Sequence, residues 1–148
     1  MNFSIRQAKV EDLDKIYELE TLCFKDPYPK NLLYILFSLY PELFLVTETG
    51  NKIVGYVSGL VRRDGYGHIV SICIHPDYRR KGLGTAMMYA IEKILKENFG
   101  VCRYRLEVRV SNEVAIKLYH KLGYRIVKTI PKYYLDNEDA YLMIKDTC

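Results

Sequence analysis

Seven consecutive residues combine three cations with two glycines: Arg79-Arg80-Lys81-Gly82-Leu83-Gly84-Thr85. They follow an apolar, strand-like segment and precede apolar residues at helical spacing. Glycines let a backbone turn tightly and approach a ligand, while the first N–H groups of a helix and its dipole attract anions. The pattern therefore predicts an anion-binding turn at the start of a helix. The simpler alternative is a plain turn that binds no ligand.

Two common phosphate-binding motifs do not match this turn. A P-loop requires Gly-x-x-x-x-Gly-Lys-Ser/Thr, which the sequence does not contain, and a dinucleotide fingerprint requires a third glycine where Met87 stands. A pyrophosphate held mainly by backbone amides, as in an acyl-coenzyme A, is compatible with the turn.

The elements that position this turn follow from hydrophobic periodicity. Strands are predicted over residues 3–8, 43–48, 53–63, 68–75, 104–110, 125–130 and 140–145. Helices are predicted over residues 11–23, 29–40, 83–98 and 112–121. The order β-α-α-β-β-β-α-β-α-β-β indicates an α/β (α+β) fold, with a mixed, mostly antiparallel seven-stranded sheet flanked by about four helices. A length of 148 residues predicts a single domain, residues 1–148.

Composition excludes several classes of protein. The net charge of +4 is too small to indicate nucleic-acid binding, and no recognition motif accompanies the scattered arginines. The longest uncharged stretch, residues 31–41, is about half of a membrane span, and the N-terminus has no apolar block of a secretory signal. We therefore expect a cytoplasmic protein that is a monomer or weak dimer and does not bind membranes.

The four cysteines are Cys23, Cys73, Cys102 and Cys148. They form no Cys-x-x-Cys pair, and no histidine lies at metal-ligand spacing from them. The sequence thus predicts no metal site and no disulfide framework, but reduced and mostly buried thiols.

Arg79-x-x-Gly82-x-Gly84 after an apolar strand resembles the signature of the GNAT acetyltransferases, and the resemblance covers nearly the whole chain. Within that family the chain is most similar to the protein N-terminal (alpha-amine) acetyltransferases of the RimI and archaeal Ard type. Three segments carry this likeness: residues 67–72, 106–112 and 132–141. The resemblance implies a GNAT fold and transfer of acetyl from acetyl-CoA directly to the amine of a protein or peptide N-terminus. A ribosomal protein and nascent chains are candidate substrates, with ribosome association as a corollary.

The resemblance also assigns the contacts to acetyl-CoA. It implies that the turn binds the pyrophosphate of acetyl-CoA through Arg79, Arg80, Lys81, Gly82, Leu83, Gly84 and Thr85. It gives the thioester carbonyl to backbone N–H groups near Ile72, Cys73 and Ile74, as in an oxyanion hole. Tyr119 becomes the general acid for the coenzyme A sulfur, and Asn112 a polar contact to the pantetheine arm. The alternative makes Tyr119 a core aromatic residue and Asn112 a helix cap.

Two residues are candidates for the general base. Glu107 and His68 match positions that act as bases in relatives, and they could share the task through a water molecule. The alternative for His68 is a structural histidine on a strand. An α-amine is roughly a tenth neutral at pH 7, whereas a lysine amine is less than about a thousandth neutral, so an N-terminal substrate needs only a weak base.

Two loops are expected to bind the substrate. Asp26 replaces the glutamate that archaeal relatives often carry between the first two helices; it could meet a substrate ammonium or cap the loop. Tyr28 fits a wall of the pocket, and Tyr133 and Tyr134 resemble the paired tyrosines that grip a peptide backbone. The carboxylates that follow are expected mainly in solvent, the alternative being that they stiffen the loop: Asp136, Glu138 and Asp139.

Two other functions stay open. A lysine or small-amine acetyltransferase would share the turn, but the paired tyrosines and the Leu-Glu-Val-Arg-x-Ser-Asn motif argue against it. An inactive acetyl-CoA-binding partner subunit would not need Glu107 or Tyr119, both of which are present.

Overall fold

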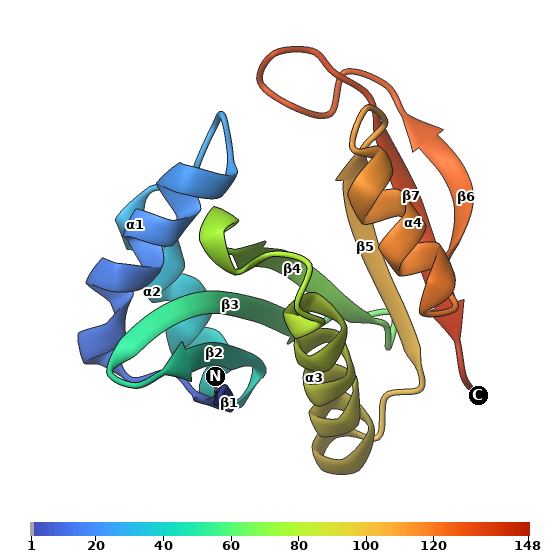
Figure 1. Ribbon diagram of the computed structural model, residues 1–148. Coiled ribbons are helices and arrows are strands. Elements are labelled where there is room, and N and C mark those ends of the chain that lie inside the picture. Colours follow the sequence, from blue (N-terminus) through green and yellow to red (C-terminus); the bar gives the residue numbers. More distant parts are fainter. Residues whose placement is uncertain (1) are drawn as a thin grey trace.

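The centre of the sheet is an antiparallel meander of β2 (Phe44–Thr49), β3 (Lys52–Val61) and β4 (Gly67–Ile74) (Figure 1). This computed structural model describes residues 2–148. The other strands are β1 (Ser4–Gln7), β5 (Arg103–Arg109), β6 (Arg125–Ile130) and β7 (Ala140–Asp146), in the sheet order β1-β2-β3-β4-β5-β7-β6. The helices are α1 (Leu13–Cys23), α2 (Lys30–Leu39), α3 (Leu83–Phe99) and α4 (Glu113–Lys121). The predicted element order and mixed sheet are confirmed.

Element ends differ from the sequence predictions by a few residues. The predicted first helix begins as a 3₁₀ turn at Val10–Asp12 before the α-helix starts at Leu13. Pro29 lies just before α2 in an extended conformation, as its N-cap, rather than inside the first turn. Residues 76–78 form a further 3₁₀ turn between β4 and the glycine-rich turn.

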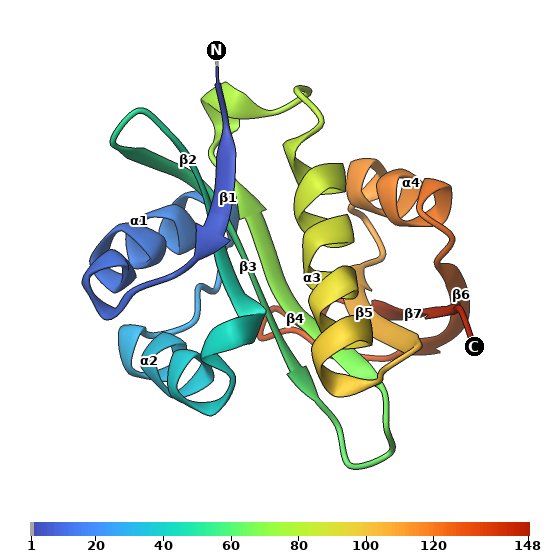
Figure 2. The same cartoon turned by 90° about the horizontal axis from the view of Figure 1, so that it is seen from below.

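Helices cover the sheet on both faces, so the protein has two cores (Figure 2). In β3, Tyr56 belongs to the core under α1 and α2, while its neighbour Val57 belongs to the core under α3 and α4. The layer of α3 and α4 packs closely on the sheet, because Gly67 in β4 has no side chain. A Cβ at that position would lie 2.8 Å from Leu95 Cδ1 in α3. Among the described residues, no helix is long and apolar enough to cross a bilayer.

Among the described residues 2–148, β4 and β5 form the only parallel strand pair, and they separate almost at once. They are paired at Gly67↔Tyr104 and His68↔Arg105 only. On its other edge, β4 carries a bulge: Ser58 pairs with Ser71 and Gly59 with Ile69, which leaves Val70 between them without a partner. Since β5 pairs with β4 only at Gly67 and His68, the edge of β4 that faces β5 forms no strand pairing beyond His68.

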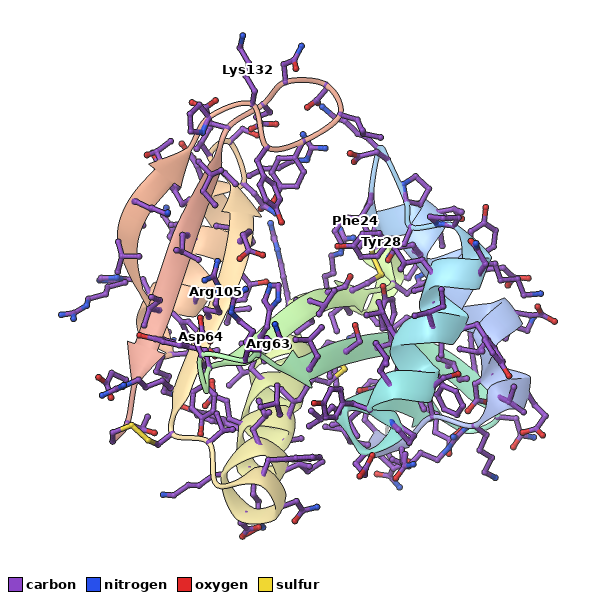
Figure 3. All side chains as sticks on the ribbon, turned by 180° about the vertical axis from the view of Figure 1, so that it is seen from behind. Phe24, Tyr28, Arg63, Asp64, Arg105 and Lys132 are labelled. Carbon is purple, nitrogen blue, oxygen red and sulfur yellow. A yellow bond between two sulfur atoms is a disulfide. The ribbon has the colours of Figure 1, made fainter. Side chains whose placement is uncertain are left out.

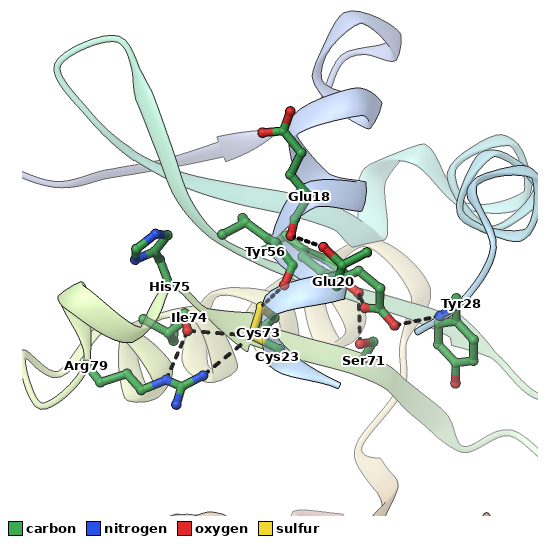
Figure 4. The surroundings of a disulfide bond; sticks show 12 residues. Glu18, Glu20, Cys23, Tyr28, Tyr56, Ser71, Cys73, Ile74, His75 and Arg79 are labelled. Carbon is green, nitrogen blue, oxygen red and sulfur yellow. Dashed lines mark hydrogen bonds between the residues drawn. A yellow bond between two sulfur atoms is a disulfide. The ribbon is translucent and has the colours of Figure 1, made fainter. Parts of the chain in front are cut away.

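The cysteines form two disulfides, so the expectation of reduced thiols is wrong. Cys23, the last residue of α1, is bonded to Cys73 in β4 (Figure 4). Cys102, directly before β5, is bonded to Cys148. The bonded partners are 50 and 46 residues apart, and only the tertiary fold brings their Cα atoms to 6.1 and 5.0 Å. Local cysteine spacing carries no signal for such pairs.

We expect reduction to destabilise the protein. Closing a loop of about 50 residues is worth about 4 kcal/mol per bond in the chain-entropy model. Urea unfolding with and without a dithiol reductant measures the loss, and a variant with all four cysteines replaced by serine should not respond to the reductant. Alkylation of four thiols in the unfolded, unreduced protein would contradict the bonding.

Candidate active site

Backbone groups of β4 line the opening between β4 and β5. The N–H of His75 donates to the carbonyl of Val54 in β3 at 2.8 Å. Since successive residues of a strand point to opposite edges, the amides of Ile74 and Ile72 point away from β3, toward β5. The carbonyl of Ile74 accepts Arg79 Nε on that side at 3.0 Å. Of the three residues expected at the carbonyl site, Cys73 turns its backbone to β3 and its sulfur to Cys23.

The glycine-rich turn presents unpaired amides at the start of α3. Arg80 and Gly82 adopt left-handed conformations, with φ of 64° and 78°, and Gly82 is the N-cap without a side-chain cap. The first helical bond comes from the N–H of Ala86 to the carbonyl of Gly82. In the described chain, no acceptor meets the N–H groups of residues 83–85, and the side chain of Lys81 forms no hydrogen bond. This row of donors fits a bound pyrophosphate.

Arg79 differs from the other cations of the turn. Besides Ile74, its guanidinium reaches the Cys23 sulfur at 3.7 Å, so it connects the turn to β4 and the disulfide (Figure 4). All three cations are exposed, but Arg80 and Lys81 form no side-chain hydrogen bond or ion pair with the described residues and remain available beside the free amides.

Two predicted cofactor contacts lie on or next to α4. Asn112 caps the helix, because its side-chain oxygen accepts from the N–H of Ala115 at 3.2 Å. The Asn112 amide nitrogen has no hydrogen bond to the described residues and stays available as a donor. Tyr119 is buried, and its ring packs on Tyr124 in the core under α3 and α4. No described group bonds its hydroxyl, and burial raises the pKa of Tyr119 to about 12, which keeps the hydroxyl protonated.

The two candidate bases contact each other directly on the opposite face of the sheet. His68 Nε2 lies 2.7 Å from Glu107 Oε1, at the point where β4 and β5 separate. Arg105 donates to the other oxygen of Glu107 at 3.2 Å, and the Tyr133 hydroxyl lies 3.4 Å from the first. Figure 3 shows Arg105 on β5, with Tyr28 opposite it beside α1 and α2.

Glu107 is held in its ionised form. Burial alone would raise its pKa, but the hydrogen bonds and charges of His68 and Arg105 outweigh burial and keep the pKa below the ordinary 4.5. An ionised carboxylate that is only 9% exposed can accept a proton through its histidine partner.

The substrate-loop residues meet at Arg109, which the sequence analysis did not single out. Asp26 pairs with Arg109 at 2.8 Å. Asp136 and Glu138 each pair with the same guanidinium at 2.9 Å. The Asp136 side chain is 43% exposed, in agreement with the expected solvent position, whereas the expectation is wrong for the partly buried Glu138. Arg109 lies two residues after Glu107 on the same face of β5, and this alternation was the available signal.

Asp139 is also engaged, because it accepts the backbone N–H of Lys132 at 2.9 Å and closes the base of the same loop. The expectation of a solvent position is wrong for this residue as well.

A buried carboxylate supports the other loop. Glu20 in α1 is 2% exposed and accepts from the Tyr56 hydroxyl and from the backbone N–H of Tyr28, the latter at 2.9 Å (Figure 4). Ser71 completes the cluster, 2.9 Å from the Tyr56 hydroxyl. Burial raises the pKa of Glu20. A glutamate on the apolar face of a predicted helix was the sequence signal for this support.

The described residues include no group of three or more His, Cys, Asp or Glu side chains that could hold a metal ion.

Comparison with known proteins agrees with this geometry. The chain matches the acetyltransferase (GNAT) family over residues 13–124. Over 95% of its length it is 44% identical to an uncharacterized N-acetyltransferase of Methanocaldococcus jannaschii, covering 90% of that protein. It is 38% identical to an N-alpha-acetyltransferase of Sulfurisphaera tokodaii, with 95% and 91% of the two chains covered. The structure matches Ard1 from Thermoplasma volcanium with a TM-score of 0.95 at 28% identity, covering 100% and 99% of the chains. This protein therefore belongs to the GNAT acetyltransferase family.

The ionised state of Glu107 predicts a pH-dependent stability. Because the folded pKa is depressed, its contribution is complete above about pH 4.5 and is lost as the pH falls through the folded value. We expect Glu107→Gln to unfold more easily than wild type by about 1–2 kcal/mol at pH 7, with the difference shrinking below about pH 4. Urea unfolding at several pH values measures this.

Glu97→Gln is the matched control, because Glu97 is exposed on α3 and should show no such pH-dependent difference. A constant difference between Glu107→Gln and wild type from pH 3 to pH 7 would refute the assigned charge state.

Proposed function

We propose that this protein transfers an acetyl group from acetyl-CoA directly to the α-amine of a protein or peptide N-terminus. The observation that carries the proposal is the His68–Glu107 pair at the separation of β4 and β5. The pair lies on the face that carries the two substrate loops, and Tyr119 lies on the opposite face. The substrate amine on one face and the thioester of acetyl-CoA on the other can thus meet between β4 and β5.

The residues present fit acetyl-CoA. When bound, it supplies a thioester carbonyl that is already activated for attack by an amine. The amides of residues 83–85, with Arg80 and Lys81, hold the pyrophosphate. The free amides of Ile72 and Ile74 stabilise negative charge on the carbonyl oxygen. Asn112 donates to the pantetheine arm through its free amide.

Proton transfer is divided between the two faces of the sheet. Glu107, ionised and bonded to His68, receives the proton of the substrate ammonium, either directly or through a water molecule. When the neutral amine nitrogen bonds to the thioester carbon, the carbon–sulfur bond would break and the nitrogen would lose its second proton to solvent. Tyr119 would donate its hydroxyl proton to the departing sulfur and recover one from solvent, so that one proton is released in total.

An N-terminal amine is favoured over lysine by chemistry and by the loops. The extra cost of deprotonating lysine is about 2.5 pKa units, or about 3.4 kcal/mol. Tyr133 and Tyr134 pack edge to face, with ring centroids 5.0 Å apart, next to Glu107. Relatives bear the name N-alpha-acetyltransferase. We extend the proposal to nascent chains at the ribosome, in the cytoplasm. Disulfides are rare in cytosolic proteins, and intracellular proteins of hyperthermophiles are an exception.

Mass spectrometry of peptides incubated with acetyl-CoA tests the function. We expect acetylation at the α-amine of peptides with varied first residues, and none at an internal lysine of the same peptides. Acetylation confined to lysine would favour the lysine or small-amine alternative. Binding of acetyl-CoA without any transfer would instead support a binding subunit.

Removal of the proposed acid and base should lower turnover. Tyr119→Phe should reduce kcat by about 100-fold. The melting temperature should stay unchanged, because the lost hydroxyl has no partner among the described residues. The His68→Gln/Glu107→Gln double variant should lose more activity at pH 7 than at pH 9, where the α-amine is mostly neutral and needs less help. Steady-state kinetics at both pH values measure these effects.

Tyr34→Phe controls for loss of a tyrosine hydroxyl, because Tyr34 is exposed on α2. Wild-type kcat in Tyr119→Phe and in the double variant would remove the proposed acid and base.

A further inference from the structure

One arginine connects the two substrate loops. Arg109 donates through one terminal nitrogen to Asp26 in the α1–α2 loop, at 2.8 Å. Through the other nitrogen it donates to Asp136 at 2.9 Å and to Glu138 at 2.9 Å in the β6–β7 loop. Its guanidinium also lies over the ring of Tyr134, 4.1 Å from the centroid. Asp26 and Arg109 are 83 residues apart, so the contact is purely tertiary.

The two loops also touch without Arg109. The backbone N–H of Leu135, in the β6–β7 loop, points to Asp26 Oδ2 at 3.5 Å. Figure 1 shows these loops reaching toward each other from the two halves of the sheet. The contact at 3.5 Å is weak, so the guanidinium is the principal link.

Electrostatics makes this link depend on Arg109. Three carboxylates surround one guanidinium whose side chain is only 16% exposed. Without Arg109, Asp26 would face Asp136 and Glu138 across the two loops with no ion-pair partner among the described residues, and like charges repel. The charge of Lys25 acts on Asp136 without pairing with it. The loops should then separate.

We propose that Arg109 is a positioning residue that holds the α1–α2 and β6–β7 loops together across the substrate. We call the contacts of Arg109 with Asp26, Asp136 and Glu138 the bridge. In this arrangement Asp26 pairs with Arg109 and does not bind the substrate ammonium. The bridge fixes Tyr134 through ring stacking and, with it, Tyr133 beside Glu107. This inference rests on the proposed function only for its effect on peptide affinity; the coupling of the loops is a property of the protein alone.

Amide hydrogen exchange on the intact protein tests the coupling without activity. Arg109→Gln should exchange faster than wild type at residues 24–29 and at residues 131–139 together. Asp26→Asn should accelerate exchange at 131–139, more than 100 residues further along the chain. Wild-type exchange at 131–139 in both variants would overturn the proposal.

Kinetics test the effect on the substrate. Arg109→Gln and Asp26→Asn should each raise the peptide KM by about tenfold, with kcat and the KM for acetyl-CoA within about twofold of wild type. Arg109→Lys should recover only part of the affinity, because one ammonium cannot hold the carboxylates and stack on Tyr134. Arg62→Gln is the matched control, since it removes a guanidinium from the Arg62–Asp64 pair elsewhere.

A double-mutant cycle separates the bridge from direct contact with the substrate. If the bridge is correct, Asp26→Asn adds nothing to the peptide KM of Arg109→Gln. If Asp26 binds the substrate ammonium, the two effects multiply and the proposal fails. Should Arg109→Gln not fold, Asp26→Asn and Arg109→Lys carry the exchange test. Absence of peptide acetylation by wild type would refute the proposed function, while exchange would still decide the bridge.

Discussion

The separation of β4 from β5 after two residue pairs is the constraint on which the site depends. Continued pairing would satisfy the amides of Ile72 and Ile74 inside the sheet and leave no room between the strands. Separation exposes these donors in the middle of the molecule, where unpaired backbone groups are costly. The bulge at Val70 lies on the same strand, and the glycine-rich turn follows β4 after the 3₁₀ turn at residues 76–78.

The same separation assigns different tasks to the two faces of the sheet. The turn at the start of α3 and Tyr119 in the core under α3 and α4 lie on the side that we propose for acetyl-CoA. On the other face, alternate residues of β5 point toward the loops, so that Glu107 and Arg109 are neighbours two residues apart. Burial keeps Tyr119 protonated, whereas charged partners keep Glu107 ionised. The local environment thus keeps a protonated hydroxyl on one face and an ionised carboxylate on the other, as the proposed acid and base require.

Local patterns in the sequence predicted the elements, their order and the glycine-rich turn at the start of α3, because each of these depends on residues close together in the chain. The sequence also identified Glu107 and His68 through a family resemblance, but not their direct contact, which depends on the register of β4 and β5. The Cys23–Cys73 disulfide and the Arg109 contacts went unpredicted for the same reason: their partners are 50 and 83 residues apart. From their charge alone, the carboxylates of the β6–β7 loop were expected in solvent, but the fold pairs Asp136 and Glu138 with Arg109.

The Cys102–Cys148 disulfide lies at the opposite end of β5 from the substrate loops (Figure 1). Cys102 directly precedes β5 and Cys148 closely follows β7; beside them, the N–H of Thr147 donates to the carbonyl of Cys102 at 2.8 Å. β5 and β7 align over seven residue pairs from this point. A slip of one residue would turn Glu107 to the opposite face of the sheet. The bond therefore favours a single alignment of β5 with β7, and it determines from a distance which β5 side chains face the proposed substrate loops.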